Sequence, residues 1–215
     1  MRRRLATCGL LTAAFAVTLG LGPGLAGGAT SRQNPPEVAI GQVRQAWDGV
    51  EVDYGLADGN TAKLEVVTPE GKTILADLKS GVSGTLVWDR KIDQAHAPLG
   101  RYRLDVTASG PGGENQTSKF VSLGFLFAKE PTVARTGMTV RYDLAQAADA
   151  ELLLRLKSGA DATVEHRSGH RGHNSITWDY RRNGRRVAGG TYRLQLVATT
   201  ASGVTARAVI GGAGR

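Results

Sequence analysis

The sequence has few of the residue types from which catalytic and metal sites are usually built. It holds one cysteine, four histidines and two methionines among 215 residues. Because Cys8 lies inside a predicted leader, the rest of the chain has neither a thiol nucleophile nor a disulfide. No Gly-x-Ser-x-Gly or His-Glu-x-x-His motif occurs, and no cofactor motif is found. We therefore expect a protein that is not an enzyme and carries no cofactor.

The only long apolar run lies near the start of the chain. Arg2, Arg3 and Arg4 precede it, it extends from Leu5 to Leu21, and small residues follow at 23–29. This pattern is typical of a secretory signal peptide. We expect a cleaved signal at 1–29, a linker at 30–37, and a secreted or cell-envelope protein of bacterial type without a transmembrane segment after cleavage. A retained anchor is the alternative, although the run is short against the ~20 residues that a spanning helix needs.

A tryptophan–aspartate pair followed by a Gly-x-Tyr segment occurs twice. The tyrosine comes 14 residues after the tryptophan in both copies. The repeated residues are Trp88, Asp89, Gly100 and Tyr102 in the first copy, and Trp178, Asp179, Gly190 and Tyr192 in the second. Such an internal duplication predicts two similar domains, a first repeat at 38–123 and a second repeat at 124–215.

The pattern within each repeat is that of short β-strands. Tyr102, Leu104 and Val106 alternate with polar residues, and turn signals separate the segments. No segment after the leader has a sustained helical period with caps. We expect an all-β protein of two tandem β-sandwiches, with one repeated tryptophan in each core. Trp47 has no counterpart in the second repeat and is also expected in the core.

Three segments of the second repeat carry a family resemblance. They are Asn174–Asp179, Asn183–Val187 and Gly190–Tyr192. Together they resemble the Ig-like domain family of the bacterial flagellar hook-cap protein. The resemblance implies Ig-like or fibronectin III-like sandwiches, without catalytic residues. The first repeat matches less well, because Lys91–Pro98 replaces the Asn-Gly turn. Nothing matches the hook-binding part of that protein, so a flagellar role is not implied.

Charge is divided unevenly between the repeats. From Glu37 to Leu123 there are nine Lys/Arg against twelve Asp/Glu, and from Gly124 to Arg215 there are fourteen against seven. Asn183-Gly184 predicts a type I′ hairpin turn with arginines on both arms. The candidate binding residues are Arg181, Arg182, Arg185 and Arg186, joined by Arg167 and Arg171 from a neighbouring loop. Guanidinium groups bind carboxylate or phosphate, so we expect an anionic envelope polymer or an acidic protein as partner, and no nucleic acid.

Three other interpretations remain open at this point. His166, His170 and His173 form a histidine-rich segment that could bind zinc, which would make the protein a metal-binding protein or a small metal-dependent hydrolase. The basic hairpin could be a solvated turn whose charges only maintain solubility. The whole chain could also be a structural spacer.

Overall fold

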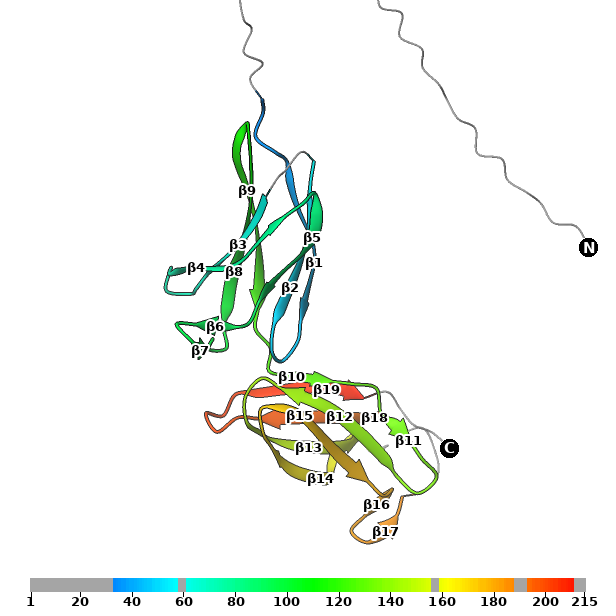
Figure 1. Cartoon of the computed structure of the whole chain (residues 1–215). Coiled ribbons are helices and arrows are strands. Elements are labelled where there is room, and N and C mark those ends of the chain that lie inside the picture. Colours follow the sequence, from blue (N-terminus) through cyan, green and yellow to red (C-terminus); the bar gives the residue numbers. More distant parts are fainter. Residues whose placement is uncertain (1–32, 58–60, 156–158, 188–192, 211–215) are drawn as a thin grey trace, which may run out of the picture. The chain divides into compact units, whose positions relative to one another are not determined.

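The computed structural model describes residues 33–57, 61–155, 159–187 and 193–210, and these residues form antiparallel strands without a helix (Figure 1). Residues 33–215 make up a compact unit by themselves. The predicted signal peptide, the start of the predicted linker, Gly190 and Tyr192 lie outside the described residues. In the part of the chain that is described, no helix is long and apolar enough to cross a membrane.

The first repeat forms two main sheets. Its strands are β1 (Val38–Gln45), β2 (Val50–Leu56), β3 (Thr61–Val67), β4 (Thr73–Ser80), β5 (Ser83–Trp88), β6 (Lys91–Ile92), β7 (Ala95–His96), β8 (Arg101–Gly110) and β9 (Gly113–Ser122). One sheet has the order β1-β2-β5, and the other has the order β4-β3-β8-β9. Strands β6 and β7 make a small separate hairpin.

The second repeat has the same plan. Its strands are β10 (Leu126–Ala128), β11 (Thr132–Val133), β12 (Met138–Leu144), β13 (Ala148–Arg155), β14 (Asp161–Gly169), β15 (Gly172–Trp178), β16 (Arg181–Arg182), β17 (Arg185–Arg186), β18 (Arg193–Thr199) and β19 (Thr205–Ile210). Strands β10, β11 and β15 all pair with β12, and the second sheet has the order β14-β13-β18-β19. Strands β16 and β17 form the hairpin that matches β6 and β7.

The duplication extends to the strand register. In the first repeat Val52 of β2 faces Leu86 of β5, and in the second Val140 of β12 faces Ile176 of β15. All four side chains are buried, because alternate residues of each strand turn to the same face. The repeated motif therefore marks a repeated three-dimensional unit, as the sequence predicts.

Each repeat has its own hydrophobic core, and a tryptophan lies in each. Trp88 is 1% exposed and belongs to the first core, while Trp178 is fully buried in the second. The alternation predicted for β8 is confirmed, since Tyr102, Leu104 and Val106 are all buried. The described chain is thus all-β, with sheets from both sides of each repeat contributing to one core, as in a β-sandwich.

One sequence-based expectation about a loop is wrong. The segment that carries Arg167, Arg171 and the three histidines, expected to be a loop, forms the facing ends of β14 and β15. It resembles a loop in sequence because glycines and polar residues interrupt it, whereas pairing with a neighbouring strand satisfies its backbone groups.

Strands β5 and β15 lie at the edges of their sheets, and a cation caps each edge. The Lys79 ammonium group donates a hydrogen bond to the Thr85 carbonyl oxygen. At the matching place in the second repeat, Arg167 Nη1 donates to the Ser175 carbonyl oxygen over 3.2 Å. Lys79 lies on β4, which pairs with β3, and Arg167 lies on β14, which pairs with β13 in the matching place, so the cap is duplicated with the fold.

Two buried tyrosines differ in how their hydroxyl groups are bonded. Tyr102, 1% exposed, donates a hydrogen bond to the Pro98 carbonyl oxygen over 2.9 Å. Tyr142 is fully buried, and its hydroxyl finds no hydrogen-bond partner among the residues that the structure describes. Burial raises the pKa of Tyr142, while Arg167 opposes that shift, so the phenol remains a neutral donor. A buried polar group without a partner lowers the free energy of unfolding.

Replacing each tyrosine with phenylalanine should therefore have opposite effects. We expect Tyr142→Phe to leave the free energy of unfolding unchanged or to raise it by up to about 1 kcal/mol, because an unsatisfied hydroxyl is removed. The matched variant Tyr102→Phe should lower it by about 1 kcal/mol, because a made hydrogen bond is lost. Urea unfolding followed by tryptophan fluorescence measures both, and a larger loss for Tyr142→Phe would contradict the assignment.

Candidate anion-binding site

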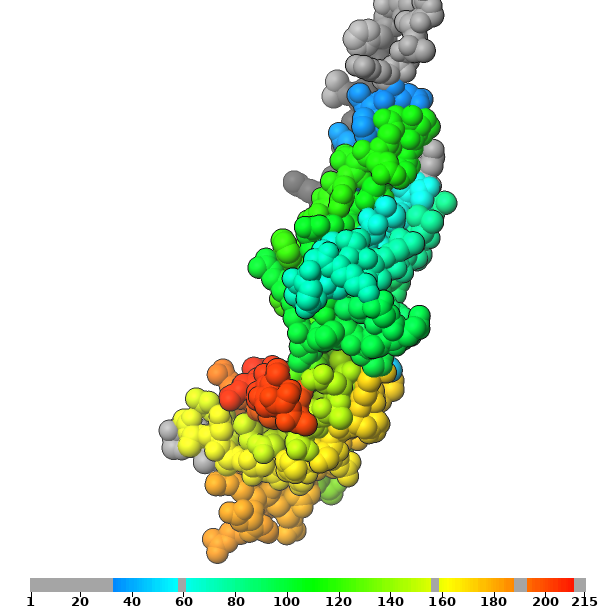
Figure 2. Space-filling model, turned by 90° about the vertical axis from the view of Figure 1, so that its left-hand side faces the viewer, coloured from blue at the N-terminus to red at the C-terminus, as the bar shows by residue number. Residues whose placement is uncertain are grey.

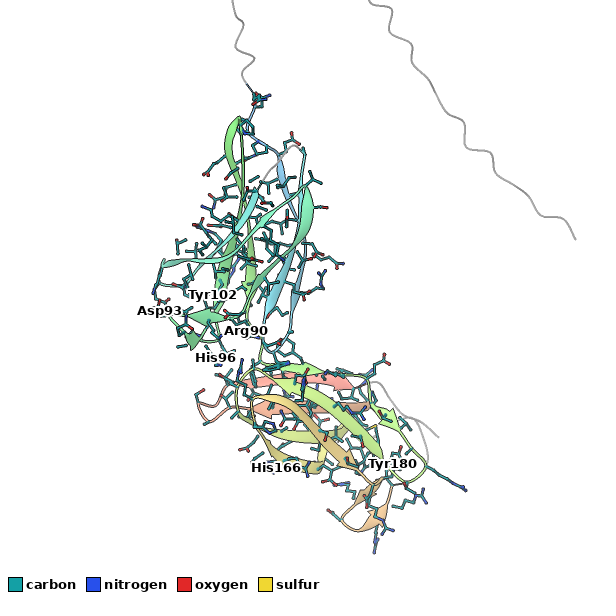
Figure 3. The ribbon with its side chains drawn as sticks, viewed as in Figure 1. Arg90, Asp93, His96, Tyr102, His166 and Tyr180 are labelled. Carbon is teal, nitrogen blue, oxygen red and sulfur yellow. The ribbon has the colours of Figure 1, made fainter. Side chains whose placement is uncertain are left out.

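The hairpin β16–β17 is anchored to the core by a buried indole. Trp178 Nε1 donates to the Arg181 carbonyl oxygen over 2.7 Å. The Asp179 carboxylate accepts the Arg181 backbone N–H over 2.9 Å, as the sequence predicts for an aspartate at a strand exit. The Val187 N–H donates to the Tyr180 carbonyl oxygen and closes the loop. Figure 3 shows Tyr180 beside this hairpin.

The first repeat makes the same three contacts. Trp88 Nε1 donates to the Lys91 carbonyl oxygen over 3.1 Å, and the Lys91 N–H donates to Asp89 over 3.0 Å. The Ala97 N–H donates to the Arg90 carbonyl oxygen over 2.7 Å. These three hydrogen bonds hold the hairpin in both repeats, so they do not depend on the arginines.

Both hairpins turn through a pair of residues with positive φ angles. Asn183 and Gly184 have φ values of 50° and 74°, as the predicted type I′ turn requires. Asp93 and Gln94 occupy the same conformation in the first repeat, with φ values of 50° and 68°. The absence of Asn-Gly there does not change the turn. Aspartate tolerates the left-handed region, whereas glutamine in it is strained.

The arginine hairpin, defined as Arg181, Arg182, Arg185 and Arg186, is exposed on all four side chains. Figure 2 shows this part of the second repeat, in orange, projecting from the surface. Arg181 lies 3.6 Å from an Asp179 carboxylate oxygen and donates to the Gly184 carbonyl oxygen. Among the described residues, the other three guanidinium groups have no ion-pair partner.

The six candidate arginines do not form one patch. Arg167 lies on β14 and caps the edge of β15. Arg171 lies at the turn before β15, where its Nε donates to the Ala145 carbonyl oxygen and its guanidinium lies 5.0 Å from the Trp47 ring centroid. Since β15 has seven residues at ~3.3 Å each, ~20 Å of strand separates Arg171 from the hairpin. The grouping predicted for Arg167 and Arg171 is wrong because the segment forms strands.

Trp47 does not lie in the core of its own repeat, contrary to the sequence-based expectation. It is half-buried, and its ring makes an edge contact with the His173 ring at 5.5 Å between centroids. Arg171 covers it as well. The cation–aromatic contact explains how a tryptophan without a counterpart is accommodated, and it occupies one of the predicted binding arginines.

The three histidines lie at different places on the β14–β15 hairpin. His166 is exposed on β14, His170 is exposed at the turn, and His173 is exposed on β15. His173 Nδ1 lies 2.6 Å from an Asp143 carboxylate oxygen. The described residues contain no group of three or more histidine, cysteine, aspartate or glutamate side chains placed to hold a metal ion. The zinc hypothesis therefore gains no support from the arrangement.

A hollow of about 540 Å³ opens on the same hairpin, next to β12. Arg141, Arg167, His170, His173 and Ser175 are among the residues that line it. Sequence reasoning did not single out Arg141 or Ser175. The signal that could have found them is the comparison of the two repeats, because Arg141 stands where the first repeat has an aspartate, Asp53.

The solved structures that match this chain match it weakly. No protein-family model matches the sequence, and no curated protein is found as a relative. A tetra-tandem repeat from the extending region of a large adhesion protein matches with a TM-score of 0.33 and 15% identity, over 84% of this chain and 49% of that chain. Dimeric latent PorU from Porphyromonas gingivalis matches with a TM-score of 0.33 and 11% identity, over 89% of this chain and 22% of that chain. β-Glucuronidase 3 from Bacteroides uniformis matches with a TM-score of 0.25 and 11% identity, over 85% of this chain and 25% of that chain.

The chain spans half or less of the length of these proteins. Their likeness assigns no activity to it.

The two turns should respond oppositely to exchange of their second residues. We expect Gln94→Gly to raise the free energy of unfolding by about 1 kcal/mol, because glycine adopts positive φ without strain. Gly184→Gln should lower it by about 1 kcal/mol for the same reason. Denaturant midpoints at unchanged m-values measure both effects. A destabilised Gln94→Gly protein would show that the glutamine side chain makes a contact that outweighs the strain.

Proposed function

We propose that this chain is an exported, non-enzymatic binding module of the cell envelope. Its second repeat contacts an anionic envelope polymer or an acidic protein partner through the arginine hairpin. Export follows from the leader predicted at 1–29. The hairpin holds exposed guanidinium groups, which bind carboxylate and phosphate in two-point geometry.

The observation that carries this proposal is a comparison between the two hairpins. The positions of Arg181, Arg182, Arg185 and Arg186 correspond to Lys91, Ile92, Ala95 and His96 in the first repeat. There the one lysine pairs with Asp89 at 3.0 Å, and Ile92 packs against the core. Figure 3 shows Asp93 and His96 on that hairpin. The same backbone therefore carries one cation in the first repeat and four in the second, so neither the fold nor the turn demands the arginines.

We also propose that both repeats are Ig-like sandwiches of the fibronectin III kind, related to the hook-cap domain family. Two features support this. The three-stranded sheet faces a four-stranded sheet in which β4 pairs with β3. Tyr102, at the start of β8, bonds to a backbone carbonyl four residues upstream, which is the tyrosine corner of many such domains. A module of this kind carries its function in its loops and hairpins, not in its core.

The hairpin is tested with the protein lacking residues 1–29, co-sedimented with isolated cell envelopes across a salt series. The test variant is Arg182→Gln/Arg185→Gln/Arg186→Gln, which leaves Arg181 to hold the turn. We expect at least a tenfold loss of apparent affinity, since three exposed charge contacts of ~0.5–1 kcal/mol each are removed. Wild-type binding should weaken as salt rises, because salt screens exposed charges.

The matched control is Arg155→Gln/Arg193→Gln/Arg207→Gln, which removes the same charge from exposed positions elsewhere in the second repeat. It should bind nearly as well as the wild type. If both variants lost the same affinity for envelopes, net charge alone would explain the binding, and a site on the hairpin would be contradicted. Protease treatment of the envelopes separates the two partner classes, because binding that survives it belongs to a polymer and binding that disappears belongs to a protein.

A further inference from the structure

One row of side chains on the outer face of the first repeat neutralises itself. Asp53 of β2 faces Thr85 of β5, and the Thr85 hydroxyl donates to the Asp53 carboxylate over 2.8 Å. Arg44 of β1 donates to the same carboxylate through two nitrogens, one of them at 2.7 Å. Hydrogen bonds from Arg44 and then from Thr85 lower the pKa of Asp53 to about 2. Cation, carboxylate and hydroxyl satisfy one another, and nothing in this row is left for a ligand.

The same row in the second repeat carries a net positive charge. Arg141 takes the place of Asp53, Ser175 that of Thr85, and Thr132 that of Arg44. Arg141 faces Ser175 across the strands, and its Nη1 donates to the Thr132 hydroxyl over 3.3 Å. No carboxylate pairs with Arg141 among the residues that the structure describes. The first repeat thus has an internal ion pair where the second, among the described residues, has an exposed cation without an ion-pair partner.

A second arginine lines the same hollow. Arg167 Nη1 donates to the Ser175 carbonyl oxygen, and within the described chain Arg167 also lacks an ion-pair partner. Arg141 on β12 and Arg167 on β14 therefore come from different sheets and line one hollow with Ser175. His170 and His173 line the hollow beside them. We call this group, Arg141, Arg167, His170, His173 and Ser175, the Ser175 hollow.

The scaffold around the hollow is hydrogen-bonded in place. The Asn174 amide donates to the carbonyl oxygens of His170 and Gly172 and accepts the His170 N–H, which fixes the turn. The neighbouring carboxylates are already occupied: Asp143 by Lys129 and His173, and Asp149 by the Ser168 hydroxyl. Lys129 offsets the charge of Asp143, whereas the Ser168 hydroxyl bonds Asp149 without neutralising it. Among the described residues, neither carboxylate forms an ion pair with Arg141 or Arg167.

We propose that the Ser175 hollow is a binding site for a phosphate ester group, separate from the arginine hairpin. A planar carboxylate is satisfied by one guanidinium in fork geometry. Two guanidinium groups that line one hollow beside a serine instead match the several oxygens of a tetrahedral phosphate and its greater charge. His173 lines the same hollow, with its Nδ1 held by Asp143.

The test is an NMR titration of the protein lacking residues 1–29, at constant ionic strength maintained with sodium chloride. The probes are inorganic phosphate, glycerol 1-phosphate, a glycerol phosphodiester and glucuronate. We expect saturable shifts of the His170 and His173 ring signals and of the Ser175 amide with the phosphate probes. The diester binding more tightly than the monoester would identify a polymer backbone as the source, and the reverse order would identify a terminal or free phosphate.

Two substitutions locate the site. Arg141→Gln should weaken phosphate binding about tenfold, the loss expected for one charged hydrogen-bonding group. Arg141→Asp restores the residue of the first repeat, whose carboxylate can accept the Ser175 hydroxyl. It should fold and bind no phosphate. The hairpin variant Arg182→Gln/Arg185→Gln/Arg186→Gln should bind phosphate as the wild type does, which separates this site from the proposed envelope contact.

Several outcomes would overturn the proposal. These are an absence of saturable shifts, shifts that sodium chloride alone reproduces, unchanged phosphate binding in Arg141→Gln, and glucuronate binding as tightly as the phosphate esters. Unchanged amide spectra outside the hollow check that each variant is folded. Loss of envelope binding with retained phosphate binding, or the reverse, would show which of the two surfaces has failed.

Discussion

The buried indole of Trp178 bonds the backbone of the hairpin that carries four arginines, and the proposed binding surface depends on that bond. A hairpin with two-residue arms has too few backbone pairs to be stable alone in water. Four neighbouring positive charges repel one another and would open it further. The indole supplies both a buried apolar body and an N–H that ends at the Arg181 carbonyl oxygen. The orientation of the charges is therefore set by the packing of the core beneath them.

The two repeats show which features belong to the fold and which have diverged. Three features occur in both repeats: the hydrogen bond from the tryptophan indole to a hairpin carbonyl oxygen, the aspartate at the strand exit, and the turn with positive φ angles. The charged residues do not: Ile92 corresponds to Arg182, and Asp53 corresponds to Arg141. A change of charge at a kept backbone position costs little stability when the side chain is exposed. Such positions are free to acquire a binding role.

The sequence predicted the parts of this structure that depend on local chemistry. Strand alternation, the buried tryptophans and the Asn183-Gly184 turn all follow from residues close in the chain. Arg171 was placed wrongly because its position depends on Trp47, which is distant in sequence, and no local pattern reports such a contact. Arg141 was missed because an outward-facing arginine on a strand looks like ordinary surface. Its neighbours become visible only when the pairing of β12 with β15 is known.

The cations that cap the edges of β5 and β15 affect how these edges can pair with a strand from another molecule. An open sheet edge offers a row of free backbone groups, and an extended segment of another molecule can add to it as a new strand. Here Lys79 and Arg167 each hold an edge carbonyl of their own repeat. Each edge therefore offers one acceptor fewer to a strand from another molecule. Another molecule that contacts these edges would meet side chains as well as backbone groups.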